Sequence, residues 1–531
     1  MAEAPEEKHG SGRSARWVAA GIFLSRIAGL VREMVFSRFF GTSVSADAWR
    51  AASKMPNVLQ NLLGEGTLSA SFIPEYSKLL QDGREEEAGR LAGVVFALLL
   101  AVAGALTLIG VLLAPALVTV FTPGFDGLQR ELTIRLVRIL FPMTGVLVLS
   151  AWSLGILNSH RSFFIPYVAP VLWNAVMIGA LLVFGPGRGQ PDLVIILGWA
   201  ALAGGGLQFL IQLPWVFRLE RSFRLSLNTR FASARRTIRN AGPATLGRGV
   251  VQVSTYFDLI LASFLVEGAV AVLGYAQTLY VLPVSLFGMS VAAAELPELS
   301  RNRDQAKEVL QARIRAGLRR IAFLVIPAAM GYIVIGGWIT AALYQRGDFG
   351  ADDAAWTHFV LIGYSVGLVA STATRLFSSS FFALGDTRTP AIYAAVRVLL
   401  AAGLGAGLML LGRNFEVAGH PLSPAGLALG SGIASWVEWS LLRRALGKRI
   451  GDVLPATGPL LRMVLAAAAA GAAGWGAGSL LPPLHPIPAG AVVLGAFVTV
   501  YFAVATALGV AEVKGVLGRV WRRFGGGKPA R

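Results

Sequence analysis

Residues 91–121 have the sequence LAGVVFALLLAVAGALTLIGVLLAPALVTVF, a run of 31 positions without a charged side chain. A bilayer core about 30 Å thick requires roughly 20 apolar residues per helix, so this stretch is long enough to cross a membrane. Similar stretches recur from Trp17 almost to the C-terminus. The whole chain is 55% hydrophobic and 14% charged, with mean hydropathy +0.63, which is too apolar for a protein surrounded by water. The sequence therefore predicts an all-α polytopic membrane protein.

The apolar stretches predict about fourteen membrane-spanning helices, each long enough to cross the hydrocarbon core. An even number of spans requires that both termini lie on the same side of the membrane. The predicted spans cover residues 17–38, 46–76, 91–121, 134–157, 164–184, 193–216, 240–266, 269–297, 318–343, 356–382, 390–412, 424–442, 460–481 and 488–510.

The formal net charge of +18 is concentrated in alternate connections between the predicted spans. Cytoplasmic loops of membrane proteins are rich in Lys and Arg, so we expect these connections and both termini in the cytoplasm, with the spans in the inner membrane. The clusters adjoin spans and lack the interleaved aromatic residues typical of nucleic-acid binding, so we expect no nucleic-acid partner. They lie at residues 218–239, 301–320, 443–449 and 514–531.

A repeated motif indicates two similar halves. Pro74-Glu75-Tyr76-Ser77 ends the second predicted span and Pro297-Glu298-Leu299-Ser300 ends the eighth, and in each span we expect a proline, Pro56 or Pro283, to break the helix. Transporters are often built from repeated halves with the substrate site between them. We predict an N-terminal lobe of six helices with its cytoplasmic linker at 1–230, a C-terminal lobe of six helices at 231–450, and two further helices with a basic tail at 451–531.

Ionisable side chains in the first two predicted spans are the strongest indication of function. Near the bilayer centre such a group costs at least about 2.5 to 3.5 kcal/mol, so it needs a cavity, a partner or a function. The first span contains Ser25, Arg26, Arg32 and Glu33. The second span carries polar residues at steps of three and four, which predicts one continuous polar helix face. They are Asp47, Arg50, Lys54, Asn57 and Asn61, with Glu65 one turn further on.

Two interpretations of these charges remain open. In the structural one, Arg26 and Arg32 pair with Asp47 or Glu33 and lock the helices together. In the functional one, the surplus positive charge lines a water-filled cavity, with Asp47 and Glu65 orienting it, and attracts an anionic head group. A planar guanidinium donates two hydrogen bonds at once to phosphate oxygens, so this interpretation implies an anionic, phospholipid-like substrate that carries pyrophosphate.

Asp258 stands alone in the seventh predicted span, where an unpaired carboxylate would be expensive. One hypothesis is that it binds a sodium ion (Na+) or a proton, which would couple transport to an ion gradient. The alternative is a salt bridge to Arg397 of the eleventh span or to Arg248. Arg375 of the tenth span has a stem long enough to reach the interface.

The sequence also lacks the motifs of several enzyme classes. It contains no G-x-x-x-x-G-K-[ST] phosphate loop, no H-E-x-x-H motif and no G-x-S-x-G elbow within a soluble domain, so we expect a transporter that does not hydrolyse ATP. It has no cysteine, which excludes disulfides and thiolate metal sites. We expect no cofactor other than a coupling ion.

The charged stretches resemble a known family. Phe23-Leu24-Ser25-Arg26-Ile27-Ala28-Gly29-Leu30-Val31-Arg32-Glu33, followed by Ala46-Asp47-Ala48, Lys54-Met55-Pro56-Asn57 and Gly64-Glu65-Gly66, is similar to the MurJ (MviN) family of lipid II flippases. This family belongs to the multidrug/oligosaccharidyl-lipid/polysaccharide (MOP) exporter superfamily. Further similar motifs, such as Asp386-Thr387-Arg388-Thr389-Pro390, extend the resemblance through the twelfth predicted span.

The resemblance implies a V-shaped, MATE-like pair of lobes that alternates between inward-open and outward-open states. It implies that the chain flips lipid II, the undecaprenyl-pyrophosphate-linked disaccharide peptide, to the periplasmic leaflet for peptidoglycan and cell-wall biogenesis and cell shape. Export of another polyprenyl-pyrophosphate oligosaccharide is the alternative. The last two helices would form a groove for the lipid tail, which the Ala/Gly-rich residues 466–478 fit. We expect a monomer in contact with lipid II and membrane lipids.

The resemblance also assigns positions around the central cavity and its gate. The matching residues are Arg26, Arg32, Asp47, Lys54, Asn57 and Glu65, next to Ser25. The family has further cavity arginines where this chain has Gln60 and Thr278, and Arg50 or Arg248 would supply the missing charge. Some members have a sodium site that includes an acidic residue of the seventh span, which Asp258 matches.

Overall fold

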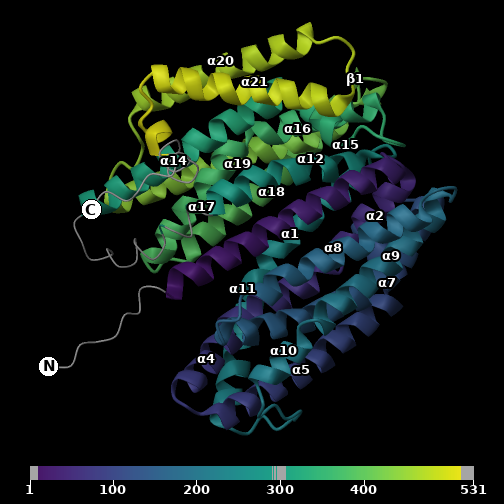
Figure 1. Cartoon of the computed structure of the whole chain (residues 1–531), viewed down its shortest axis with the longest axis vertical. Helices are drawn as coiled ribbons and strands as arrows, with labels where there is room; N and C mark the ends of the chain where they lie inside the picture. The colour runs from purple at the N-terminus through teal and green to yellow at the C-terminus, as the bar shows by residue number, and fades with distance from the viewer. Residues whose placement is uncertain (1–9, 290, 292–294, 296–306, 516–531) are drawn as a thin grey trace. The chain divides into compact units, whose positions relative to one another are not determined.

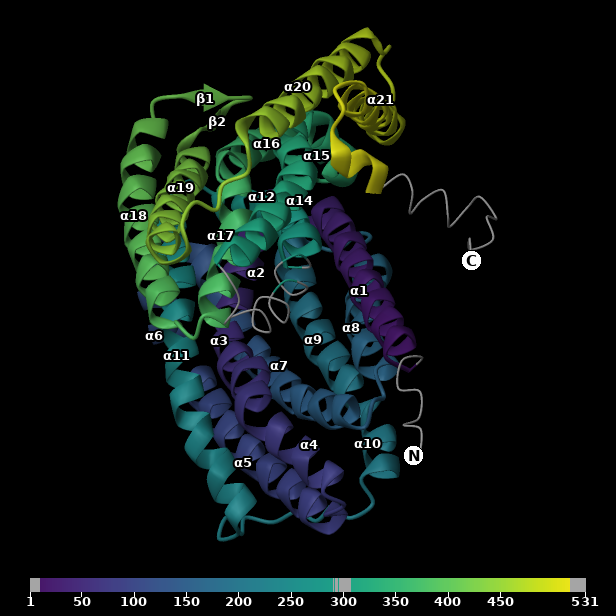
Figure 2. The ribbon, with the colours of Figure 1, turned by 90° about the vertical axis from the view of Figure 1, so that its left-hand side faces the viewer.

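The computed structural model describes residues 10–289, 291, 295 and 307–515, and it divides the chain into two compact units, Met1–Ala271 and Val272–Arg531. Helices form nearly all of the described residues, which confirms the predicted all-α class (Figures 1 and 2). The lobe boundaries predicted at 230/231 and 450/451 stay a prediction. Of the sequence features, the motif at 297–300 and the tail at 516–531 lie outside the described residues.

The N-terminal unit is a bundle built around α7, which packs against α2, α5 and α9 (Figure 1). Trp152 of α7 is wholly buried, and its indole N–H donates to the carbonyl of Ala92 in α5 at 3.1 Å. The outer helices of the bundle carry exposed apolar side chains such as Leu108 and Leu112, as expected of a surface that faces lipid. The elements are α1 (Gly10–Phe40), α2 (Val44–Lys54), α3 (Asn57–Leu59), η1 (Gln60–Phe72), α4 (Ile73–Gln81), α5 (Glu85–Leu112), α6 (Ala114–Phe121), α7 (Gly127–Ser159), α8 (Phe164–Phe184), α9 (Gln190–Leu210), α10 (Leu213–Leu219) and α11 (Ala232–Ser263).

The second predicted span is broken. α2 ends at Lys54, and a turn at Met55 and Pro56 precedes α3 and the π-helix η1. Proline has no N–H to donate and its ring clashes with the preceding turn, so the helix breaks there. The prediction of one continuous polar face is therefore wrong, because Asn57 and Asn61 lie beyond the break that ends α2.

In the C-terminal unit, α18 lies along α19, and α20 pairs with α21 and packs on α14 (Figure 2). Tyr501 of α21 donates to the carbonyl of Phe323 in α14 at 2.7 Å. Pro283 ends α12, and a second π-helix, η2, follows it, so a proline precedes a π-helix in both units. The elements are α12 (Ala269–Pro283), η2 (Val284–Gly288), α14 (Lys307–Val334), α15 (Gly336–Tyr344), α16 (Ala351–Val366), α17 (Leu368–Ala383), α18 (Arg388–Gly412), β1 (Glu416–Val417), β2 (His420–Pro421), α19 (Ser423–Ile450), α20 (Thr457–Leu480) and α21 (Pro486–Ala507).

Glycine brings α18 and α19 together. A Cβ on Gly430 would lie 2.5 Å from the backbone nitrogen of Gly405, so neither helix could approach as closely with a larger residue at position 430. By contrast, a Cβ on Gly403 would have nothing within 4 Å. The contact is therefore specific to one face of α18.

Nine helical stretches in the described part of the chain are long and apolar enough to cross a membrane. Helices α16 and α17, which meet at a bend of 41°, raise the number to ten if they form one broken span. Each of the fourteen predicted ranges overlaps a helix or a broken series of helices, but the number fourteen is not confirmed.

Candidate functional site

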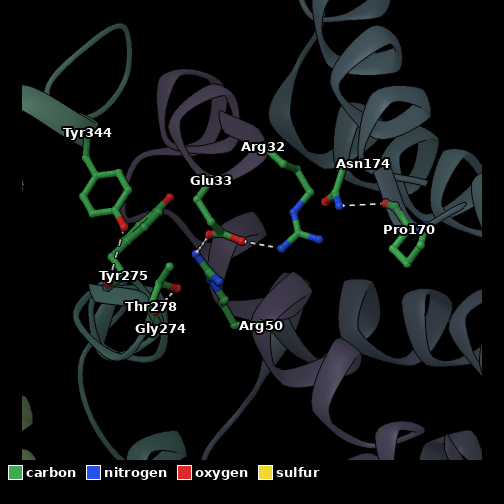
Figure 3. Close-up of polar contacts among 9 residues, drawn as sticks. All are labelled: Arg32, Glu33, Arg50, Pro170, Asn174, Gly274, Tyr275, Thr278 and Tyr344. Carbon is green, nitrogen blue, oxygen red and sulfur yellow. Dashed lines mark hydrogen bonds and ion pairs between the residues drawn. The ribbon is translucent and has the colours of Figure 1, made fainter. Parts of the chain in front are cut away.

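Two of the predicted arginines converge on Glu33 in α1 (Figure 3). Its Oε1 lies 2.7 Å from Nη2 of Arg32, and its Oε2 accepts a hydrogen bond from Arg50 of α2. The side chain of Glu33 is 6% exposed, against 22% for Arg32 and 13% for Arg50. The guanidinium carbon of Arg32 lies 5.5 Å from the ring centroid of Trp173, and that of Arg50 lies 5.2 Å from Phe36. Two guanidiniums share one carboxylate, so this Glu33 cluster keeps one surplus positive charge.

The other residues of the first span are placed differently. Arg26 is exposed, seven residues before Glu33 on α1, and it is not part of the Glu33 cluster, while Ser25 is half-buried. Arg32 thus has the partner that the structural interpretation named, but the carboxylate is shared with Arg50, which that interpretation did not include. The sequence shows the three charges but not that they meet, because α1 and α2 pack together only in the folded chain.

Asp47 connects parts of the chain that are distant in sequence through hydrogen bonds. Its side chain is buried, and its Oδ2 accepts the N–H of Gly268 at 2.7 Å and Nε2 of Gln129 at 2.9 Å. Its Oδ1 accepts the N–H of Ala271 at 2.7 Å. The carboxylate therefore binds N–H groups at the start of α12 that have no partner within that helix. Both oxygens are occupied, which gives Asp47 a structural role, and its place among the substrate-binding residues stays a prediction.

Lys54 and Asp258 interact electrostatically within the N-terminal unit. The nearby Tyr256 donates to the carbonyl of Met55 at 3.1 Å, so α11 is tied to the break in the second span. Lys54 therefore places a positive charge near Asp258. The sequence had predicted Lys54 only as a substrate-binding residue and not as a partner of Asp258. The side chains of Arg248 and Glu65 lie outside the described residues.

Arg397, the other partner considered for Asp258, pairs with Glu438. Its Nε lies 3.0 Å from Oε2 of Glu438, and the pair joins α18 to α19. Glu438, a single acidic residue near the end of an apolar stretch, was not among the predicted site residues, although an ionisable group inside a predicted span is itself a signal.

The two positions that depart from the family pattern have neutral surroundings. Gln60 lines a cavity of about 160 Å³ in the N-terminal unit, together with Ser150 and Gln208. Gln208 and Gln212 both donate to Oγ of Ser150, at 3.2 and 2.7 Å, and their amide oxygens have no hydrogen-bond partner within the described residues. Of these two residues only Gln208 lines the cavity, and its unpaired amide oxygen is an acceptor that suits water or a hydroxyl group. Thr278 donates to the carbonyl of Gly274 in its own helix at 2.9 Å (Figure 3).

A metal site of several acidic or histidine ligands does not occur in the part of the chain that the structure describes. A sodium ion or proton at Asp258 stays a prediction.

Comparison with known proteins identifies relatives over most of the chain. Residues 36–485 match the family described as "Lipid II flippase MurJ". The "Probable lipid II flippase MurJ" of Bdellovibrio bacteriovorus is 31% identical over 515 residues, covering 95% of this chain and 94% of that protein. The "Lipid II flippase MurJ" of Burkholderia cenocepacia is 30% identical over 439 residues, covering 81% and 83%.

Solved structures share the fold. "Lipid II flippase MurJ, inward closed conformation" aligns with TM-score 0.76 at 23% identity, covering 92% of this chain and 98% of that chain. An inward-facing multidrug resistance MATE family transporter of the MOP superfamily aligns with TM-score 0.62 at 19% identity, covering 80% and 95%. The helical arrangement is therefore common to flippases and drug exporters, and the fold alone does not identify the cargo.

Proposed function

The chain belongs to the lipid II flippase MurJ family, and from this premise we propose that it flips lipid II by alternating access for cell-wall synthesis. It is a multi-pass membrane transporter and not an enzyme. Lipid II, the undecaprenyl-pyrophosphate-linked disaccharide peptide, would pass from the cytoplasmic to the periplasmic leaflet, and the protein would act as a monomer among membrane lipids.

The surplus charge of the Glu33 cluster is the observation that supports this cargo. Glu33 engages one nitrogen of Arg32, and the remaining N–H groups of that guanidinium can donate to diphosphate oxygens. Arg50 and Lys54 add positive charge close by. A low-dielectric environment strengthens the attraction of an anion and the repulsion of a cation, so the cluster favours a diphosphate over a cationic drug.

We assign supporting roles to the exposed or half-buried polar residues of the first two spans. Arg26 and Asn57 are exposed and Ser25 is half-buried, so these side chains are open to a ligand. Glu65 completes the substrate-binding set by resemblance to the family.

Complementation of a host whose own flippase is depleted tests the proposal. The wild-type chain should restore growth and the exposure of lipid II at the outer leaflet. Arg32→Gln and Arg50→Gln should reach the membrane in normal amount and lower the flipping rate by about tenfold or more each, since a charge-assisted hydrogen bond contributes about 1.5 to 3 kcal/mol.

Arg135→Gln is the matched control, because Arg135 is 60% exposed and paired with Glu131 on the surface of α7. Full complementation by both Arg32→Gln and Arg50→Gln would contradict the role of the cluster. A wild-type chain that reaches the membrane and exposes no lipid II would contradict the cargo, and the same assay with another polyprenyl-pyrophosphate oligosaccharide would then test the alternative.

We also propose that the protein lies in the inner membrane with both termini in the cytoplasm, because alternate connections are basic. The chain has no cysteine, so single introduced cysteines report the topology without background. An impermeant maleimide should label Pro483→Cys in intact cells and Leu227→Cys only after the cells are opened. Labelling in the opposite pattern would contradict the proposed orientation and show that the termini lie in the periplasm.

A further inference from the structure

A second charge cluster lies in the C-terminal unit. Arg397 and Glu438 form its ion pair, with side chains 31% and 8% exposed. Arg375 of α17 lies close enough to act electrostatically on the same carboxylate. One guanidinium thus pairs with the carboxylate and a second acts on it electrostatically, so this Glu438 cluster of Arg375, Arg397 and Glu438 also keeps one surplus positive charge.

Hydroxyl groups accompany the charges of the Glu438 cluster. Tyr280 of α12 donates to Oγ of Ser371 in α17 at 2.7 Å, and its ring centroid lies 5.3 Å from that of Tyr364. Tyr280 lies within electrostatic range of Arg397, Arg375 and Glu438. The hydroxyl of Ser371 in turn donates to the carbonyl of Leu368 at 3.1 Å, so both hydroxyl protons are engaged within the protein. The hydroxyls therefore make the surroundings of the two guanidiniums polar, and the guanidiniums supply the charged donors that oxyanion sites use.

Arg375 decides between a structural and a binding role for the cluster. The pair of Arg397 with Glu438 is sufficient to join α18 to α19, and it does not require a second guanidinium. Arg375 is exposed although the residues on both sides of it, Thr374 and Leu376, are buried. It lies about 12 Å along the helix axis from the end of α17 at Ala383, at a rise of about 1.5 Å per residue. A guanidinium at this depth is costly unless its stem carries it to the interface or it faces a polar partner, and the electrostatic interaction of Arg375 with Glu438 favours the polar partner.

We propose that Arg375 and Arg397, beside the hydrogen-bonded hydroxyls of Tyr280 and Ser371, form a second anion site that takes a phosphate or carboxylate group of the transported lipid. Glu438 orients Arg397 and lowers the net positive charge of the site. The anion is therefore bound weakly enough to be released. The proposal rests on the proposed function, because lipid II supplies both chemistries, a diphosphate and the carboxylates of its peptide. The two sources share the charged oxygens that a guanidinium binds in pairs.

Binding to the full chain in nanodiscs of uncharged lipid tests the site. Three probes separate the two sources of charge: lipid II, lipid II with amidated peptide carboxylates, and undecaprenyl diphosphate. Arg375→Gln should weaken lipid II binding by about tenfold, as expected for loss of one charge-assisted contact. If the anion is a carboxylate, the variant should bind the amidated lipid as the wild type does. If the anion is the diphosphate, the loss should persist with undecaprenyl diphosphate.

Arg413→Gln is the matched control, since Arg413 is an exposed residue at the end of α18, and its binding should be unchanged. Equal affinity of the wild type and Arg375→Gln for all three probes would overturn the second site and leave the proposed function intact. A wild-type chain that binds none of the probes would overturn both.

Glu438→Gln should change the affinity for lipid II in the opposite direction to Arg375→Gln. It leaves Arg397 without its carboxylate and raises the local positive charge, so a binding site predicts severalfold tighter binding of lipid II. Unchanged affinity in a folded Glu438→Gln protein would mean that the cluster only joins helices, and would overturn the proposal.

Discussion

The Glu33 cluster and the Glu438 cluster place the same charges in different settings. In the N-terminal unit both Arg32 and Arg50 bond to Glu33 directly, and an aromatic ring covers each guanidinium. In the C-terminal unit only Arg397 bonds to Glu438, and Arg375 remains exposed. The comparison indicates that the first cluster is held in one geometry by its own partners and offers a ligand only the N–H groups that Glu33 leaves over, whereas the second has a whole guanidinium, Arg375, that is exposed.

The largest expected effect comes from removal of the shared carboxylate. Glu33→Gln leaves two largely buried guanidiniums without their partner, and breaking such a pair costs about 3 to 5 kcal/mol. Glu438→Gln should cost less, about 1 to 2 kcal/mol, because only one guanidinium is affected and it is 31% exposed. Denaturation of both variants in the same detergent checks the difference.

A double variant sharpens that result. Glu33→Gln with Arg50→Gln removes one of the unpaired charges, so the two changes should be non-additive and part of the stability should return. Equal loss of stability in Glu33→Gln and Glu438→Gln would remove the contrast between the clusters.

Asp47→Ala should have the next largest effect. It removes the acceptor for the two backbone N–H groups at Gly268 and Ala271 and for the amide of Gln129. Buried donors left without an acceptor cost about 1 to 3 kcal/mol, so we expect a loss of about 2 kcal/mol and faster hydrogen exchange at the start of α12. Gln129→Leu, which removes only the side-chain donor, is the control and should leave this exchange unchanged. If the amides of Gly268 and Ala271 stay protected from hydrogen exchange in Asp47→Ala, Asp47 does not hold the start of α12.

Gly430→Ala tests the helix contact that carries the Glu438 cluster. Its Cβ would meet the backbone of Gly405 at 2.5 Å, so α18 and α19 must separate, at a cost of about 1 to 3 kcal/mol. Gly403→Ala in α18, the other helix of the pair, is the control, because a Cβ there would have nothing within 4 Å, and it should be neutral or slightly stabilising. If both variants melt alike, close approach at Gly430 does not stabilise the pair.

Asp386, in the connection between α17 and α18, shows what a charge contributes outside the membrane. Its carboxylate accepts the N–H of Thr389 at 2.9 Å and the hydroxyl of Thr389 at 2.7 Å, and it pairs with Arg449. The N–H of Thr389 is the main cause that lowers the pKa of Asp386 to about 2.

The sign of the pH dependence follows from this shift. Because the folded pKa lies below the ordinary value of 3.8, the stabilisation is present above about pH 4 and is lost as the pH falls towards 2. Asp386→Asn should therefore lower the melting temperature by about 1 °C at pH 7 and by less at pH 3, a small effect because solvent screens the site. A difference that grows on acidification would contradict the assignment.

The fold was predictable where composition alone decides it. The predicted span 164–184 coincides with α8. In lipid, an apolar segment that crosses the membrane alone can satisfy its backbone N–H and C=O groups only by hydrogen bonds within a helix. The break of the second span at Pro56 was also predicted, whereas the polar face was extended across it, because periodicity does not show how far a proline interrupts a helix.

The candidate site was predictable only as a set of charges. The unusual positions of Arg32, Arg50 and Asp258 are visible in the sequence, because ionisable groups are rare in apolar stretches. Their partners are not, because Glu33 meets Arg50 through helix packing and backbone N–H groups leave no sequence pattern. Glu438 is different, because an ionisable residue inside the predicted span 424–442 was itself visible in the sequence, and only its pairing with Arg397 was not.

The contacts of Asp47 also bear on the order in which the chain matures during synthesis. Asp47 is separated from Gly268 and Ala271 by 221 and 224 residues, so the ribosome completes nearly all of the N-terminal unit before either backbone donor exists. Until then, the carboxylate of Asp47 can be solvated only by the amide of Gln129 or by water. A chain that stalls before residue 268 should therefore be a better substrate for membrane quality-control proteases than one that stalls just after residue 271.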